Sequence, residues 1–264
     1  AYLDAIVDVA NDKGYYVLVQ TICREADYIK VSKAFREKRI DGGILIGTRE
    51  DTLEKINITK IEEELVIFDY ELKALAKQIA SKNVTILNAN DEEAMELAVN
   101  HLIEEGMESI GFITGVESAL SARRRFAGFC KSMDNCGCTR DDRFVLQGEF
   151  NQDITYREME KAIEENRVAQ SYICANDYMA MAAIDCLRDH GIKVPEEVSF
   201  IGFDNTRTGQ LMTPKLTTLT PSYIGMAKRA VEIIDTRVRD QEAHIPEMIE
   251  YKVDLLKRYS VKKR

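Results

Sequence analysis

The sequence predicts an α/β protein built from two doubly wound parallel-sheet lobes. Short, continuous apolar runs alternate with amphipathic segments along the whole chain, and the alternation forms two series in tandem. Continuous apolar runs are typical of parallel strands that helices cover on both faces. A length of 264 residues is comfortable for two domains.

The first series opens with a helix, because apolar residues recur at helical spacing before Gly14. A β-branched and aromatic segment then predicts a strand over 15–21, and a charged amphipathic helix follows over 26–38. Three short apolar runs predict buried strands at 42–47, 65–69 and 84–88.

The second series begins with a helix that Asn90 or Asp91 caps and Gly106 ends. Further helices are predicted at 120–133, 154–165, 178–190 and 224–239. Strands are predicted at 109–114, 144–148, 172–175, 200–203 and 217–220. The alternation over 248–256 is typical of an edge strand.

The charge balance argues against direct binding of nucleic acid. The formal net charge is −9, whereas a DNA-binding surface must neutralise phosphates with Lys and Arg. No apolar run approaches the roughly 18 residues of a membrane helix, and the first residues lack the basic start of a signal peptide. We therefore expect a cytoplasmic protein without a membrane segment.

The cysteines are scattered, as reduced cytoplasmic cysteines are: Cys23, Cys130, Cys136, Cys138, Cys174 and Cys186. The close pair Cys136-Gly137-Cys138 lacks the spacing of a zinc or redox motif, and is interpreted as a helix ending at Gly137. His101, His190 and His244 lack metal-ligand spacing. The sequence has no nucleophile elbow and no P-loop, so we expect no catalytic residue, metal or cofactor.

Polar residues end two predicted strands of the second series. Asn176-Asp177 follows YICA, and Asp204-Asn205 follows SFIGF. In an open α/β sheet, small ligands bind at the carboxyl ends of the strands. Each residue also has a local alternative, because Asn and Asp favour turns and helix caps, and Asp177 is expected to cap the following helix.

An arginine cluster opens the predicted helix 120–133, within Ser121-Ala122-Arg123-Arg124-Arg125-Phe126-Ala127-Gly128-Phe129. The helix dipole disfavours cations at this end, which suggests another purpose for at least one of these arginines. A guanidinium that binds oxygens of a ligand is one interpretation. The alternative is a solvated basic patch with ion pairs.

Residues 171–223, with VPEEVSFIGFDN at their centre, closely resemble the effector-binding domain of the lactose-repressor (LacI/GalR) family of transcription regulators. The resemblance implies a periplasmic-binding-protein-like fold whose lobes are joined by three crossovers. It places the N-terminal lobe at 1–89 plus 220–240 and the C-terminal lobe at 90–219 plus 241–264. The family's first lobe opens with a strand that has no counterpart before the helix at 1–13, so we expect upstream residues.

The resemblance also assigns effector contacts, residue by residue: Asp69, Ser121, Arg125, Phe150, Asn176, Asp204 and Tyr223. Phe150 and Tyr223 would supply aromatic rings against a sugar or a base, although core packing is the alternative for Phe150. Two positions depart from the family. Tyr70 stands where Arg often follows the acid, and Pro221 stands where Gln is frequent.

From the resemblance we expect the ligand-sensing domain of a homodimeric transcription regulator. A small polar effector, a sugar or sugar derivative, would bind between the lobes and favour one inter-lobe arrangement. Operator DNA would be bound only through an upstream module. The alternatives are a solute-binding protein of a sugar transporter, which the cysteines and the missing export signal disfavour, and an enzyme of doubly wound fold.

Overall fold

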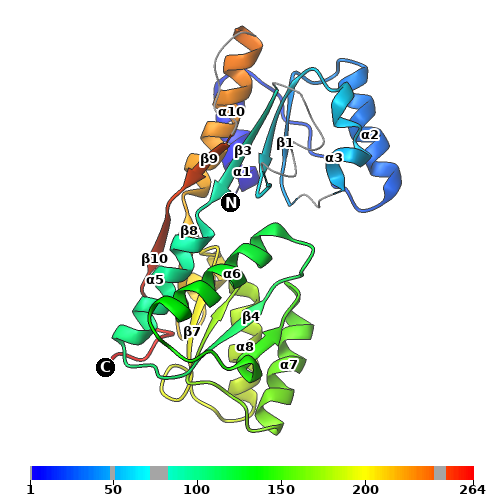
Figure 1. Ribbon diagram of the computed structural model, residues 1–264. Helices are drawn as coiled ribbons and strands as arrows, with labels where there is room; N and C mark the ends of the chain where they lie inside the picture. Colours follow the sequence, from blue (N-terminus) through cyan, green and yellow to red (C-terminus); the bar gives the residue numbers. More distant parts are fainter. Residues whose placement is uncertain (1, 48–50, 72–82, 241–247) are drawn as a thin grey trace. The chain divides into compact units, whose positions relative to one another are not determined.

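The computed structural model describes residues 2–47, 51–71, 83–240 and 248–264 (Figure 1). The chain divides into two compact units, the first formed by residues 1–89 and 222–251 and the second by residues 90–221 and 252–264. Both are α/β, each with its own sheet, which confirms the predicted fold class.

The first unit is a four-stranded parallel sheet with helices around it. The strand order is β1 (Gly42–Leu45), β2 (Glu64–Phe68), β3 (Val84–Ala89) and β9 (Met248–Tyr251). The helices and turns, in chain order, are α1 (Tyr2–Asp12), α2 (Glu25–Arg36), α3 (Thr52–Lys55), the 3-10 turn η1 (Ile58–Lys60) and α10 (Tyr223–Arg239).

Alternation along β2 gives this unit two cores. Leu65 and Ile67 face a cluster that contains Phe35 of α2, whereas Val66 and Phe68 pack with Met226 and its neighbours on α10. Successive side chains of a strand point to opposite faces, so the four apolar residues Leu65 to Phe68 need cover on both faces of the sheet. All five residues of β2 are buried accordingly.

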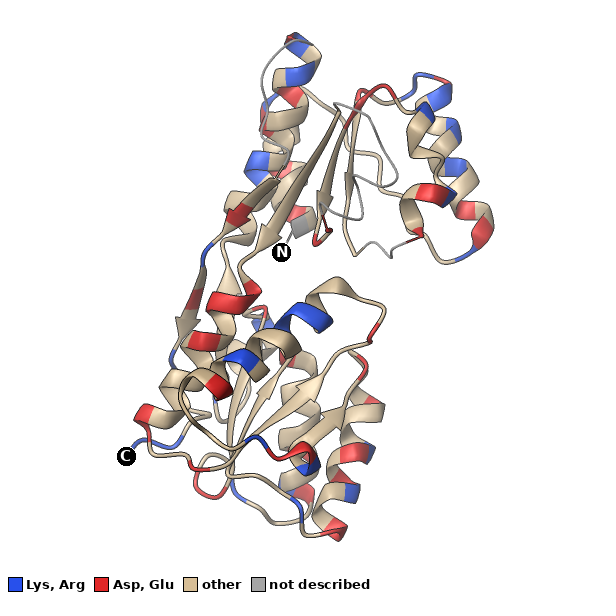
Figure 2. Ribbon diagram, in the orientation of Figure 1, with Lys and Arg blue, Asp and Glu red and all other residues tan. Residues whose placement is uncertain are grey.

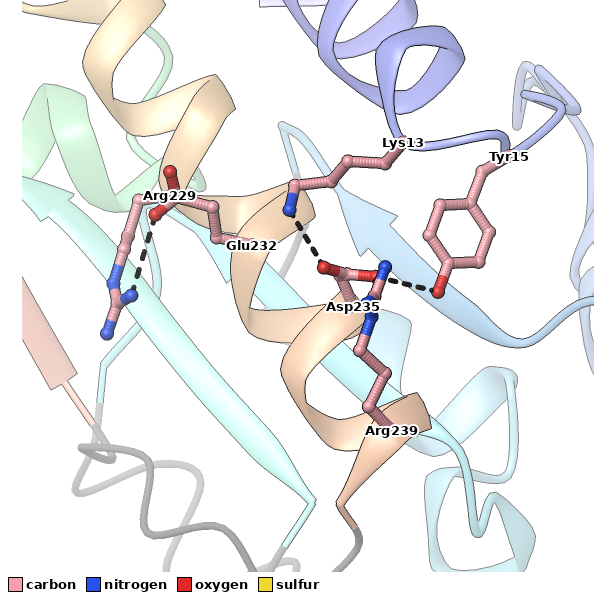
Figure 3. A network of polar contacts seen from close by, with 6 residues as sticks. All are labelled: Lys13, Tyr15, Arg229, Glu232, Asp235 and Arg239. Atoms are coloured by element: carbon pink, nitrogen blue, oxygen red, sulfur yellow. Dashed lines mark hydrogen bonds and ion pairs between the residues drawn. The ribbon is translucent and has the colours of Figure 1, made fainter.

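Helix α1 is attached to α10 by apolar packing and by a polar network around Asp235 (Figure 3). The Asp235 carboxylate accepts hydrogen bonds from Lys13 Nζ at 2.8 Å, Arg239 Nε at 2.8 Å and Tyr15 Oη at 3.1 Å. The hydrogen bonds from Lys13 and Arg239 lower the pKa of Asp235 to about 2. The carboxylate is therefore held in its charged form where the two helices meet.

The predicted strand at 15–21 is wrong, because residues 15–23 form no strand in the structure. Tyr16 is fully exposed and Leu18 and Val19 are mostly exposed. β-branched and aromatic residues favour a strand by packing on a half-buried pleated surface, and the described sheet provides none here. The sheet begins instead at β1.

The second unit is a six-stranded sheet, ordered β10, β8, β7, β6, β4, β5. Its strands are β4 (Ile110–Thr114), β5 (Val145–Gln147), β6 (Ser171–Cys174), β7 (Ser199–Phe203), β8 (Thr217–Pro221) and β10 (Val253–Leu256). Its helices and turns are α5 (Asp91–Glu104), α6 (Leu120–Asn135), η2 (Asp142–Phe144), α7 (Gln152–Glu164), α8 (Asp177–Asp189) and α9 (Arg207–Leu211). Strand β10 is antiparallel to β8, and the other pairs are parallel.

The helices of this unit pack in two pairs, α5 with α6 and α7 with α8, and each pair contacts the sheet. The chain runs from β4 outward to β5, and then from β6 in the opposite direction to β7 and β8. The strand order therefore reverses between β4 and β6. The rings of Phe112 on β4 and Phe129 on α6 stack with their centroids 5.0 Å apart, which packs α6 against β4.

The end of the chain differs from the prediction of one edge strand over 248–256. Met248–Tyr251 forms β9 beside β3 in the first unit, and Val253–Leu256 forms β10 beside β8 in the second. The chain thus passes between units at residues 251 and 252, rather than near Asp240 as we expected. The other passages, at 89–90 and 221–222, lie at or within two residues of the predicted positions.

Charged residues of both signs lie mainly on the helices and connections of the two units, and most strands carry few (Figure 2). None of the described helices combines the length and hydropathy needed to cross a bilayer.

Candidate functional site

The point where the second sheet reverses its strand order is the candidate site. In open α/β sheets the connections from the two strands at a reversal run to opposite faces, which opens a crevice at their carboxyl ends. Here these strands are β4, followed by Gly115, and β6, followed by Ala175 and Asn176. Four of the predicted contact residues lie around this edge: Arg125, Phe150, Asn176 and Asp204.

Asn176 is held by the start of α8. Its Oδ1 accepts a hydrogen bond from the backbone N–H of Met179 at 2.8 Å, so Asn176 is the N-cap. The expectation that Asp177 caps this helix is wrong, because Asp177 is its first residue and points elsewhere. The capping hydrogen bond fixes Oδ1 of Asn176, and the side chain is half-buried at the carboxyl edge of the second sheet.

Arg125 is a buried centre of the site. Its Nε donates to Asp91 Oδ1 at 2.9 Å, and its Nη1 donates to the backbone oxygen of Ala175 at 2.6 Å. The guanidinium carbon also lies 3.4 Å from the centroid of the Phe203 ring. Arg125 thus contacts the residues immediately before Asn176 and Asp204, and brings the ends of β6 and β7 together.

Phe150 follows β5 and covers the end of β4. A Cβ atom on Gly115 would lie 2.2 Å from Cζ of Phe150, so glycine is needed for the ring to lie where it does. Glu149 and Phe150 both have positive φ, at 52° and 55°. The backbone N–H groups of Gly148 and Glu149 both donate to Thr114 O at 3.0 Å, which anchors this turn to β4.

Strained backbone concentrates at strand ends. Asp69, Glu149, Phe150, Asp204 and Asn205 all have positive φ and all follow the carboxyl end of a parallel strand. Non-glycine residues adopt this conformation at a cost, of order 1–3 kcal/mol each when the region is sparsely populated, and such residues cluster at ligand sites. At Glu149, Phe150, Asp204 and Asn205 the strain marks the same edge of the second sheet as the polar side chains, and at Asp69 it marks the carboxyl edge of the first sheet.

Asp204, with φ of 107°, sits in a turn that a buried acid holds. Oδ2 of Asp177 accepts from the Thr206 N–H at 2.6 Å and from its hydroxyl at 3.0 Å, and Oδ1 accepts from the Thr218 hydroxyl at 2.6 Å. Asn205 N–H donates to that hydroxyl oxygen as well, at 3.3 Å. Asp177 therefore links α8, the turn after β7, and β8.

Burial, with a smaller contribution from the charge of Asp204, raises the pKa of Asp177 to about 6, although the hydrogen bonds from Thr218 and Thr206 act to lower it. Gly202 leaves the space that Asp177 needs, since a Cβ there would lie 2.2 Å from its Oδ1. Asp177 is thus a positioning group behind Asp204.

The C-terminal segment closes the same turn from the other side. Arg258 donates through Nη2 to Asn205 Oδ1 at 2.5 Å and through Nη1 to Leu216 O at 2.7 Å. Neither Asp177 nor Arg258 was predicted from the sequence to be a positioning residue. The sequence did offer a signal for Asp177, which is an acid placed between an N-cap residue and an apolar helix. Arg258 offered none, because it lies too far along the chain to be connected with Asn205 by spacing.

Two predicted contacts belong to the first unit. Asp69 follows β2 with φ of 55°, and Asn88 fixes the next residue by exchanging two hydrogen bonds of 3.0 Å with the backbone of Tyr70. Tyr223 opens α10, after the N-cap Ser222. Both side chains are half-buried.

Ser121 is the second residue of α6 and is half-buried, and its contact with an effector stays a prediction. In the described part of the chain, no group of three or more His, Cys, Asp or Glu side chains could hold a metal ion. The chemistry that the edge offers is therefore hydrogen bonding, charge and aromatic packing.

Comparison with known proteins defines the class. Residues 99–261 match the family described as periplasmic binding protein-like domain. The chain belongs to this family, and within it to the effector-binding domains of LacI/GalR transcription regulators, as the sequence predicted.

Among curated relatives, the chain is 31% identical to the HTH-type transcriptional repressor PurR of Pasteurella multocida over 86% of its own length and 66% of the relative's. It is 29% identical to the repressor of the same name from Haemophilus influenzae, over 95% of its own length and 73% of the relative's. The chain thus spans between about two thirds and three quarters of these relatives.

Solved structures share the fold. A complex of the transcriptional regulator CelR with cellobiose superposes with a TM-score of 0.87, at 19% identity, over 98% of this chain and 77% of the other. A LacI transcriptional regulator from Alkaliphilus metalliredigens QYMF, complexed with D-xylulofuranose, gives 0.82 at 22% identity, over 99% and 93%. The lac repressor dimer bound to operator and an anti-inducer gives 0.83 at 21% identity, over 98% and 88%.

Proposed function

We propose that this chain is the ligand-sensing part of a cytoplasmic, homodimeric transcription regulator, and that it acts by binding a small polar effector rather than by catalysis. The effector binds at the carboxyl edge of the second sheet, against Asn176, Asp204 and the ring of Phe150. Binding is relayed to a DNA-binding module outside residues 1–264, since the net charge of −9 does not suit this chain for DNA.

One observation supports this proposal above the others. A carboxamide, a carboxylate and a guanidinium, of Asn176, Asp204 and Arg125, gather where the strand order reverses, on a backbone that is strained at Asp204. Polar groups that are already held on rigid strand ends lose little further conformational entropy when a ligand binds, which favours affinity.

A carbohydrate is the first candidate effector. Carboxylate and amide groups accept and donate to vicinal hydroxyls, and an aromatic ring covers the apolar face of a sugar. Two neighbours in structure are complexes with sugars. A planar nitrogenous base is the second candidate, because the Phe150 ring lies over Gly115 at the end of β4, and an aromatic ring stacks on such a ligand.

Contacts from Asp69 and Tyr223 complete the proposal, as the family resemblance implies. An effector that touches residues of both units favours whichever inter-lobe arrangement allows all contacts at once, and it can shift that equilibrium only by its differential affinity. Asp69→Asn and Tyr223→Phe should each weaken binding if the effector is contacted from the first unit as well.

The test is a thermal-shift screen of monosaccharides, disaccharides, nucleobases and nucleosides, followed by calorimetry of the hits. A ligand that binds only the native state raises the apparent melting temperature. Asp204→Asn is the sharp variant, because Asn tolerates positive φ whereas Ala would add strain. We expect it to weaken binding by about 2 kcal/mol, near 30-fold.

Asp254→Ala is the matched control, an exposed acid on β10 whose loss should leave the affinity unchanged. If Asp204→Asn binds a hit as tightly as the unchanged chain does, the site lies elsewhere. A solute-binding protein of a transporter is the alternative function. Failure of the full-length protein to bind any DNA, together with sugar binding, would favour it.

A further inference from the structure

The C-terminal end of α6 places two thiols on either side of one left-handed glycine. Cys136 is the C-cap, Gly137 has φ of 69°, and Cys138 follows. The N–H of Gly137 donates to Asp134 O at 3.1 Å and that of Cys138 to Met133 O at 3.0 Å. These two bonds form the closed motif that ends many helices, so the backbone around both thiols is fixed.

This backbone suits a disulfide. The distance between the Cα atoms of Cys136 and Cys138 depends on φ and ψ of Gly137 alone. A left-handed helical residue is the mirror image of a right-handed one, whose neighbours are about 5.4 Å apart by helix geometry. Disulfides join Cα atoms separated by roughly 4.4–6.8 Å. The space beside Gly137 is open, since nothing lies within 4 Å of a Cβ built there.

The two thiols lie close enough to influence each other, since the Cys136 thiol, together with burial, raises the pKa of Cys138 to about 11. Cys136 Sγ also lies 3.2 Å from Met133 O. Cys136 is exposed and Cys138 is partly buried. A reagent in solution therefore reaches Cys136 first, with the second thiol beside it.

We propose that Cys136 and Cys138 are an oxidation site, in which a peroxide converts the two thiols into an intramolecular disulfide. The Cys136 thiolate attacks one peroxide oxygen, the O–O bond breaks, and a sulfenic acid and hydroxide form. The Cys138 sulfur then attacks the sulfenic sulfur, the S–O bond breaks, and the departing hydroxide takes the Cys138 proton as water. Two thiols and one hydrogen peroxide thus give one disulfide and two waters.

The other described cysteines lack this combination. Cys174 and Cys186 are buried, and burial raises the pKa of Cys186 to about 12. Cys23 is exposed but lies in the first unit. Cys130 interacts with Arg140 and is the cysteine closest in sequence to the pair, so it is the competitor to test. Among the described residues no third ligand joins the pair to make a metal site, which leaves thiol chemistry.

The experiment treats the reduced chain with a few equivalents of hydrogen peroxide, blocks the remaining thiols with N-ethylmaleimide under denaturing conditions, and digests it with trypsin. Cleavage after Lys131 and Arg140 releases residues 132–140, which contain both thiols, whereas Cys130 is released in 126–131. We expect peptide 132–140 to lose both maleimide labels and to be about 2 Da lighter than its reduced form. Reduction with dithiothreitol should restore both labels.

Variants decide the order of events. In Cys138→Ser, Cys136 should accumulate as a sulfenic acid that dimedone traps, whereas Cys136→Ser should leave Cys138 unmodified at the same dose. Cys130→Ser is the matched control and should form the disulfide as readily as the unchanged chain. Retention of both maleimide labels on peptide 132–140 while Cys23 is oxidised, or a link between peptides 126–131 and 132–140, would overturn the proposal.

Discussion

Asp177 is a buried acid whose protonation should be visible in the stability of the protein. Its pKa is about 6 in the folded chain, above the ordinary value of 3.8, because burial disfavours the charged form. A group with a raised folded pKa adds stability that is complete below the unfolded pKa and is lost as pH rises through the folded pKa. Asp177 therefore favours folding more at pH 5 than at pH 7.

The variant Asp177→Asn should destabilise the second unit at both pH values. An amide places N–H groups where Asp177 accepts from Thr206 and Thr218, so at least one buried donor loses its acceptor, at roughly 2 kcal/mol. Because Asn does not titrate, the loss should be about 1 kcal/mol greater at pH 5 than at pH 7. Urea unfolding at the two pH values measures this difference, and a loss that is smaller at pH 5 would contradict the assigned shift.

Arg125 shows why some site residues cannot be tested by truncation alone. The sequence predicted a ligand contact, and the structure adds a buried ion pair with Asp91, whose side chain is 3% exposed. Removing one partner of a buried pair leaves an uncompensated charge, which commonly costs 3–5 kcal/mol. Loss of binding in Arg125→Ala would therefore mix ligand chemistry with unfolding, which is the reason to test Asp204 first.

Most elements were predictable because local pattern and tertiary packing agree. The buried strands β2, β3 and β4 lie within one residue of their predicted positions, because continuous apolar runs are satisfied only in a covered sheet. Residues 15–21 carry an equally strong strand pattern and form none, since a strand also needs a neighbour to pair with. The short elements α3, α9, η1 and η2 were missed, because three to five residues are too few for an apolar residue to recur at helical spacing.

The candidate site was predictable where its residues end strands. Asn176 and Asp204 were found in this way, and the structure joins them through the contacts of Arg125. The residues that position them were not predictable. Asp91, Asp177 and Arg258 act through partners that are at least 29 residues away in the chain. Spacing along the sequence carries no information on such contacts.

The contact between α1 and α10 should depend on pH through Asp235. Its pKa of about 2 lies below the ordinary 3.8, so its contribution is complete above pH 4 and is lost as pH falls toward 2. Asp235→Asn should lower the stability of the first unit by about 1 kcal/mol at pH 7, a figure that allows for the exposure of Lys13 and Arg239. Near pH 2 the variant and the unchanged chain should differ little.

Glu232 provides the control for this prediction on the same helix. It pairs with Arg229 at 3.6 Å and is half exposed, so Glu232→Gln should change the stability by less than about 0.5 kcal/mol (Figure 3). Hydrogen exchange of the backbone amides of α1 and α10, which belong to the first unit, measures both variants. An equal loss in the two would show that the Asp235 network adds nothing specific.

Each unit of the molecule is assembled from segments that are distant in the chain. The first takes α10 and β9 from the second half of the sequence, and the second takes β10 and the following residues from its end. Folding of either unit must therefore bring together residues more than 150 positions apart, as in the contact of β3 with β9. Such long-range contacts are slow to form, because the chain loses conformational entropy before the contacts contribute any favourable free energy.

Deleting residues 252–264 tests whether the two units are separately stable. Ser260 is fully buried, with its hydroxyl accepting from Thr217 N–H at 2.8 Å and donating to Phe200 O at 2.6 Å. The deletion also removes β10, which leaves the ladder edge of β8 unpaired. Hydrogen exchange should accelerate by at least tenfold in β7 and β8, while β2 and β3 of the first unit keep their protection because none of their pairs is lost.

Ser260→Ala should give a smaller change confined to the same strands, since it leaves one buried donor and one buried acceptor without a partner. Equal acceleration in β2 and β3 would mean that the units unfold together, and the division of the molecule into two cooperative parts would then be wrong.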